Sequence, residues 1–130
     1  MGTWNTSSFD NDDAQDWLAE LDEAEDTDIL TEALSAVAEN EDYVKAPEAQ
    51  QAVAAAEVVA AMNGHPAADL PGEAATWSQR HGSADSTLAG LARRAVTRVQ
   101  TDSELKELWD EGDATDWNAM MSDLAARLAL

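Results

Sequence analysis

The chain has 130 residues, of which 27 are acidic and 7 basic, a formal net charge of -20 and no cysteine. This length is typical of one domain with one hydrophobic core, and the lack of cysteine excludes disulfides, thiolate metal sites and a cysteine nucleophile. The negative charge opposes binding to nucleic-acid phosphates and to anionic membranes, so neither is an expected partner.

Apolar residues recur at helical spacing along almost the whole chain after residue 11, and no segment convincingly shows the alternation of a β-strand. In the first predicted helix, Ala14, Trp17, Leu18 and Leu21 form one apolar stripe. The predicted helices cover about residues 12–25, 28–39, 47–62, 73–81, 85–100, 102–111 and 114–128.

The third of these helices is expected to be central. It starts at Pro47 and ends before Gly64, an asymmetry typical of helix ends, and Glu57 is its only charged residue after Glu48. A helix that is apolar nearly all round needs neighbours on several sides. We therefore predict a single all-α domain, residues 1–130, with six to seven helices around this Ala/Val-rich helix. Residues 1–9 would form an N-terminal arm and residues 63–72 a connecting loop.

Several side chains carry more specific predictions. Thr101 followed by Glu104 matches a capping box at the start of the sixth helix. Tyr43 and Val44 are expected to turn inward from the loop before the central helix. The apolar stripes place three of the five tryptophans in the core: Trp17, Trp109 and Trp117.

The acidic residues are concentrated in the first 79 positions, where Lys45 is the only basic residue. This part has a net charge of -17, whereas residues 80–130 have a net charge of -3. Three interpretations follow. The acidity could hold water in a salt-rich cytoplasm, complement a basic protein partner (including by imitating the phosphate array of DNA), or bind a divalent cation.

A cluster of four acids, Asp10, Asp12, Asp13 and Asp16, lies at the start of the first helix. In the structural interpretation they cap the helix and complement its dipole. Asp10 and Asp12 are also similar to the opening of a calcium loop. Where that loop needs glycine and glutamate, however, this chain has glutamine and leucine, which excludes an EF-hand. Asp12 and Asp16 are one helical turn apart and could share a weakly held divalent ion.

The opening of the chain has a distinctive pattern, Met1-Gly2-Thr3-Trp4 followed by Phe9-Asp10-Asn11-Asp12-Asp13-Ala14 and Asp16-Trp17. It resembles the bacterial domain-of-unknown-function family numbered 4259, whose members begin with Met-Gly-x-Trp-Gly and continue with Phe-(Asp/Glu)-Asn-Asp-x-Ala-x-Asp-Trp. Asn5 and Ser7 stand where that family usually has glycine. A looser match extends over most of the chain. The resemblance implies a shared fold and supplies no catalytic residues.

Motifs for catalysis are missing from the sequence. His65 and His81 do not have the spacing of zinc ligands, and no serine lies in a Gly-x-Ser-x-Gly motif. No glycine-rich phosphate loop is present. We therefore expect neither enzyme activity nor a cofactor.

The sequence favours a non-enzymatic accessory protein that binds a basic protein partner, such as a DNA-binding protein, a nuclease or a toxin. We expect it in the cytoplasm, because it shows no secretory signal and no apolar run of roughly 20 residues. The resemblance to a bacterial family implies that this cytoplasm is prokaryotic. The contact surface would be the acidic face from about residue 10 to residue 42. The expected partner-binding residues are Trp4, Asp10, Asp12, Asp13, Asp16, Glu20 and Glu23.

Two alternatives remain beside this expectation. The chain could be a small divalent-metal-binding protein or enzyme built on the Asp10–Asp16 cluster, with Asp12 and Asp16 as ligands. The acidity could also be an adaptation to a salt-rich cytoplasm alone, in which case it carries no information about partners.

Overall fold

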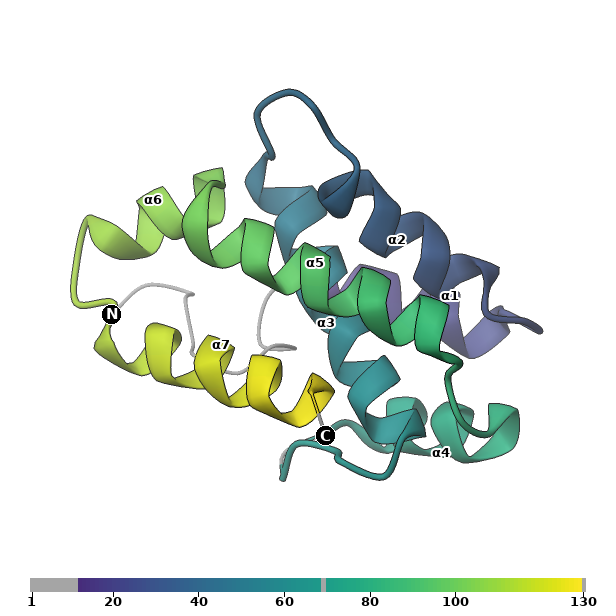
Figure 1. The fold of residues 1–130 in the computed structure, drawn as a ribbon. Helices are drawn as coiled ribbons and strands as arrows, with labels where there is room; N and C mark the ends of the chain where they lie inside the picture. The colour runs from purple at the N-terminus through teal and green to yellow at the C-terminus, as the bar shows by residue number, and fades with distance from the viewer. Residues whose placement is uncertain (1–11, 69, 130) are drawn as a thin grey trace.

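Alanine and valine fill the segment after Pro47, and this segment forms the central helix of the fold (Figure 1). In the computed structural model, which describes residues 12–68 and 70–129, helix α3 (Ala46–Met62) is buried almost from end to end. It ends in a Schellman motif, in which the amide of His65 donates to the carbonyl oxygen of Ala60 at 2.9 Å. Gly64 adopts a φ of 87° in this motif, which explains a glycine at this position.

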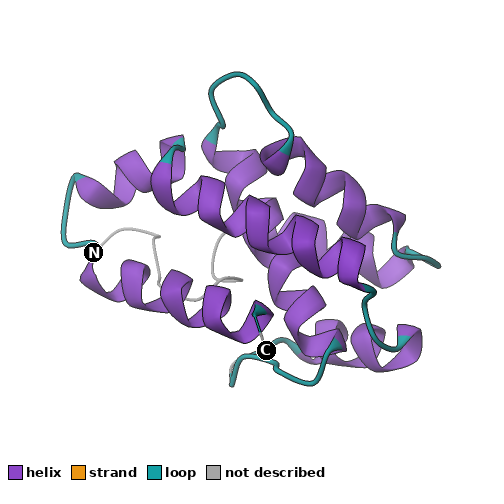
Figure 2. Ribbon diagram, viewed as in Figure 1, coloured by secondary structure: helices purple, strands orange, loops and turns teal. Residues whose placement is uncertain are grey.

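The described residues form seven helices and contain no strand (Figure 2). The all-α prediction is therefore confirmed, and most helix ends lie within two residues of the predicted positions. Besides α3, the helices are α1 (Asp12–Glu23), α2 (Asp28–Ala38), α4 (Gly72–His81), α5 (Ser86–Thr101), α6 (Glu104–Asp110) and α7 (Thr115–Leu128).

The helices pack around α3 as one compact domain. Helices α2 and α5 both contact α3 and also contact each other. Helices α6 and α7 lie on one side of α3, and α1 and α4 lie on the other (Figure 1). Their apolar stripes meet in one core, whose largest fully buried side chains include Leu21, Leu34, Trp77, Leu105 and Met121. Burying each leucine contributes roughly 1.5–3 kcal/mol.

The core predictions are confirmed for two of the three tryptophans. Trp17 and Trp117 are buried, as expected. Trp109 is only partly buried, although it packs against the core and stacks on Trp117 with ring centroids 6.1 Å apart. Trp77 is fully buried, and its indole N–H donates to the carbonyl oxygen of Ala24 at 3.0 Å.

The predicted capping box at Thr101 is wrong. Helix α5 continues through Thr101, whose hydroxyl donates back to the carbonyl oxygen of Thr97 at 2.8 Å. Helix α6 therefore begins at Glu104, two residues later than predicted. Its N-cap is Ser103, whose hydroxyl accepts from the amide of Lys106 at 3.1 Å. Glu104 instead caps α3, since its carboxylate accepts from the amide of Ala46 at 2.8 Å.

The prediction for Tyr43 and Val44 is half right. Val44 is fully buried, whereas Tyr43 is 48% exposed. The hydroxyl of Tyr43 donates to the carboxylate of Glu107 at 2.9 Å, so the ring lies along the surface between the loop before α3 and helix α6. A phenol with a partner at the surface does not need to enter the core.

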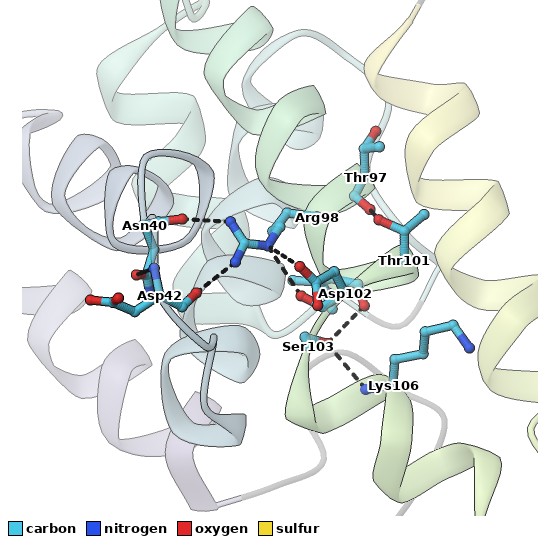
Figure 3. Close-up of polar contacts among 9 residues, drawn as sticks. Asn40, Asp42, Thr97, Arg98, Thr101, Asp102, Ser103 and Lys106 are labelled. Carbon is cyan, nitrogen blue, oxygen red and sulfur yellow. Dashed lines mark hydrogen bonds and ion pairs between the residues drawn. The ribbon is translucent and has the colours of Figure 1, made fainter.

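Arg98 fastens the same loop to α5 (Figure 3). Its Nη1 donates to the carbonyl oxygen of Asn40 at 2.6 Å, and its Nη2 donates to that of Asp42 at 2.7 Å. Its Nε lies 3.3 Å from the carboxylate of Asp102. The planar guanidinium is suited to this task because it presents several donors in fixed directions.

Two further points concern the predicted organisation. The predicted connecting loop lies between the end of α3 at Met62 and the start of α4 at Gly72. The predicted N-terminal arm, residues 1–9, lies outside the described residues. Of the helices within the described ranges, none combines the length and the apolar character that crossing a membrane requires.

Candidate partner-binding surface

An acidic surface covers α1, α2 and the loop that follows α2. Residues 12–42 contain thirteen acids and no basic residue, and all of these acids except Asp13 are exposed. We call these residues the acidic surface: Asp12, Asp13, Asp16, Glu20, Asp22, Glu23, Glu25, Asp26, Asp28, Glu32, Glu39, Glu41 and Asp42.

The basic residues of the chain form their ion pairs elsewhere. Four ion pairs join described residues, and every acid in them lies C-terminal to the acidic surface: Arg98–Asp102, Lys106–Asp110, Arg127–Glu57 and Arg127–Asp123. Among the described residues, therefore, no acid of the acidic surface has an ion-pair partner. Its charge faces solvent, where it repels anions and attracts cations.

Four of the seven predicted partner-binding residues fall on one line of α1. Asp12, Asp16, Glu20 and Glu23 follow helical spacing and are all exposed. At a rise of 1.5 Å per residue, this line is about 16 Å long. Asp13 lies beside it and is half-buried. The other two predicted residues, Trp4 and Asp10, lie outside the described residues.

The metal alternative relies on the same end of α1. Asp12 and Asp16 are on successive turns and both are exposed, and Asp10 is not described. Within the described residues, no three side chains of the metal-ligating types converge on one point. Two exposed carboxylates give a divalent ion few of the six or more oxygen ligands that calcium prefers.

A groove separates α1 from α2. Both helices pack on α3, but they make few contacts with each other. The space between them is a cavity of about 160 Å³. Residues from all three helices line it: Trp17 and Glu20 of α1, Ile29, Glu32, Ala33 and Ala36 of α2, and Gln51 of α3. We call this cavity the α1–α2 groove.

A second cavity, of about 250 Å³, lies between the starts of α2 and α5. Its lining includes the hydroxyl residues Thr27, Thr31 and Ser83 and one carboxylate, Asp85. That carboxylate already caps α5, because it accepts from the amide of Leu88 at 2.8 Å. The lining contains no histidine and no basic residue, so it offers no acid–base pair for catalysis.

Glu57 is a buried acid whose carboxylate forms a structural contact. Its carboxylate is 2% exposed and forms a bidentate ion pair with Arg127, with Nη1–Oε1 at 2.8 Å and Nη2–Oε2 at 3.3 Å. Burial alone would lower the pKa of Arg127, but its hydrogen bonds and ion pairs with Glu57 and Asp123 outweigh this effect and raise the pKa. Arg127 also donates to the carbonyl oxygen of His65 at 3.1 Å. These contacts join α3, α7 and the loop after α3.

His81 is likewise part of the framework. Its ring stacks on Trp77 with centroids 3.9 Å apart. Its Nδ1 lies 3.0 Å from the carbonyl oxygen of Trp77, and its Nε2 lies 3.1 Å from that of Glu25. The Nε2 contact therefore joins α4 to the connection between α1 and α2, whereas the Nδ1 contact lies within α4.

The predicted contact surface of residues 10–42 includes α2, but the predicted site residues name neither the α2 side nor the α3 side of the groove. Glu32, Ala36 and Gln51 were not among the predicted site residues, although Asp28, Glu32 and Glu39 have the same i, i+4, i+11 spacing as Asp12, Asp16 and Glu23. That repeated acid spacing is a signal for a second acidic line. Helices α1 and α2 lie side by side because both pack on α3. The spacing of residues within one helix does not reveal such a tertiary arrangement.

Comparison with known proteins identifies one family. A family model described as "Domain of unknown function (DUF4259)" matches residues 2–120, which is nearly the whole chain. No curated protein and no solved structure matches the chain.

Proposed function

The chain belongs to the DUF4259 family, and we propose that it is a non-enzymatic interaction protein that binds a basic protein partner through the acidic surface. The observation that carries the proposal is the position of the charge. Thirteen acids lie on α1, α2, the connection between them and the loop that follows α2, with no basic residue among them. The ion pairs between described residues are all formed elsewhere.

This distribution suits association with a cationic surface. Acids that already pair within the molecule would have to exchange partners before they could contact another protein. Those of the acidic surface have no such internal partner among the described residues. A one-sign surface also steers a basic partner during diffusion, which raises the association rate at low ionic strength. The affinity of such a complex falls as salt screens the charges, with a screening length of about 10 Å at 0.1 M.

The non-enzymatic part of the proposal is supported by the use of the ionisable groups in the described interior. Glu57 and Arg127 pair with each other, and the ring nitrogens of His81 contact carbonyl oxygens. A general acid or base must instead reach the proton that it transfers.

The test measures the rate at which a basic partner protein associates with charge variants of the full chain. The binding variant is Asp12→Asn, Asp13→Asn and Asp16→Asn together. The matched control removes three acids outside the acidic surface, with Glu73→Gln, Glu111→Gln and Asp116→Asn, so that both proteins lose the same charge.

We expect the binding variant to associate several-fold to tenfold more slowly than the control at low salt, and the difference to disappear above about 0.5 M KCl. Equal association rates for the wild type and the binding variant would refute the proposal. Circular dichroism of both variants verifies that they remain helical.

A further inference from the structure

The α1–α2 groove combines two kinds of lining within one small cavity. Its walls include the indole of Trp17, which is 3% exposed, and the apolar side chains of Ile29 and Ala33. It also includes two exposed carboxylates, Glu20 from α1 and Glu32 from α2. These carboxylates belong to the acidic surface, so the groove lies within the proposed binding surface.

The lining restricts the chemistry of an occupant. A purely apolar side chain would pack against the apolar walls. It would, however, remove water from two carboxylates without replacing their hydrogen bonds, which is costly. A divalent ion would find two carboxylates and the amide of Gln51, with apolar groups around them, which is a poor oxygen shell. A long side chain with an apolar stem and a cationic head satisfies both parts of the lining.

Arginine matches this requirement better than lysine. Its guanidinium is planar and carries five N–H donors, so one head group can contact two carboxylates at once. It also stacks on aromatic faces more readily than an ammonium does, and Trp17 lies in the wall. Lysine offers a compact, strongly hydrated charge that loses more water on entering a groove.

We propose that the α1–α2 groove receives an arginine side chain of the basic partner, with the stem along Trp17 and Ile29 and the guanidinium between Glu20 and Glu32. This inference rests on the proposed function and deepens it. The acidic surface steers the partner, and the groove selects arginine over lysine at one position of the complex.

The experiment measures binding of an octa-arginine peptide and an octa-lysine peptide to the full chain by calorimetry in dilute buffer. The groove variant is Glu20→Gln with Glu32→Gln. The control, Glu23→Gln with Glu39→Gln, removes the same charge outside the groove, from the last residue of α1 and from the C-cap of α2. A third variant, Ala36→Phe, fills the groove without changing the charge, at a position that is exposed.

We expect the groove variant to lose about tenfold in affinity for octa-arginine, and the control to lose about threefold or less. Ala36→Phe should lose a similar amount to the groove variant although its charge is unchanged. The preference of the wild type for octa-arginine over octa-lysine should disappear in both groove variants.

Other results separate the two proposals. If the groove variant and the control lose affinity equally and Ala36→Phe loses none, the groove is not an arginine site, while the acidic surface still binds cations. If the wild type binds neither peptide at low salt, both the groove and the proposed function are overturned.

Discussion

The carboxylate of Glu57 and the guanidinium of Arg127 meet in a bidentate ion pair although seventy positions separate them in the chain. Glu57 lies on the central helix α3 and Arg127 on the last helix α7. Glu57 is the only charged residue of α3 after Glu48, and each of its two carboxylate oxygens accepts a hydrogen bond from Arg127. Removing one partner is therefore far more costly than removing both.

The first prediction concerns this pair. Arg127→Met leaves a buried carboxylate without its cation, so the free energy of unfolding should fall by about 3–5 kcal/mol. The double variant Glu57→Met with Arg127→Met removes both charges and should be much closer to the wild type. Urea denaturation of the wild type and of both variants measures these free energies of unfolding.

The control for this series is Asp123→Asn, which removes the exposed partner of the same guanidinium. Exposed pairs contribute less than about 1 kcal/mol, so this change should be small. If Arg127→Met is no more destabilising than Asp123→Asn, the buried pair does not anchor α7.

The second prediction concerns Arg98 and the loop before α3. Arg98→Met removes the donors to the carbonyl oxygens of Asn40 and Asp42, and the free energy of unfolding should fall by about 2 kcal/mol. Amide hydrogen exchange should also speed up across residues 40–45. Arg94→Met, at an exposed position of the same helix, is the control and should leave exchange in the loop unchanged.

The third prediction uses Tyr43, which is the only tyrosine of the chain. Desolvation, the hydrogen bond to Glu107 and the negative charge of Glu107 and its acidic neighbours raise the pKa of Tyr43 from 10.0 to about 12. Absorbance of tyrosinate at alkaline pH therefore reports this one residue. Its midpoint should lie near 12 in the folded protein, and Glu107→Gln should move it toward 10.

The sign of the linked stability follows from the direction of this shift. Folding favours the neutral phenol, so the contribution of this contact is complete below about pH 10 and is lost as the pH rises toward 12. Circular dichroism of the same samples shows whether the helices persist during the titration. A tyrosinate midpoint near 10 in the folded wild type would contradict the hydrogen bond between Tyr43 and Glu107.

The fourth prediction separates a binding surface from an adaptation to salt. Helices α1 and α2 are anchored by the buried side chains of Leu18, Leu21, Leu30 and Leu34, which together outweigh repulsion among exposed charges in high dielectric. The helical circular dichroism signal should therefore be complete in about 10 mM KCl. The melting temperature should rise modestly with salt as repulsion is screened. Helices that form only in multimolar KCl would favour the salt-adaptation alternative.

The helices themselves could be predicted from the sequence because their stripes are local. On α5, Leu88, Leu91, Ala95 and Val99 have helical spacing, and all four are buried. The central position of α3 likewise follows from a segment that is apolar nearly all round.

Features that depend on packing could not be predicted in this way. The choice between Thr101 and Ser103 as the cap of α6 depends on where α5 stops. The capping-box pattern favours Thr101, which Glu104 follows at the required spacing, whereas Lys106 follows Ser103. The pairing of Glu57 with Arg127 needs the relative placement of α3 and α7. The α1–α2 groove exists because two helices pack on α3 without closing on each other, which no spacing within one helix encodes.

An NMR titration of the full chain with octa-arginine at low salt locates the binding surface residue by residue. We expect chemical-shift changes confined to residues 12–42, the amide of Gln51 and the indole N–H of Trp17, and we expect them to disappear in about 0.5 M KCl. Shift changes centred instead on α6 and α7, or on the cavity between α2 and α5, would contradict the claim that the acidic surface is the binding surface.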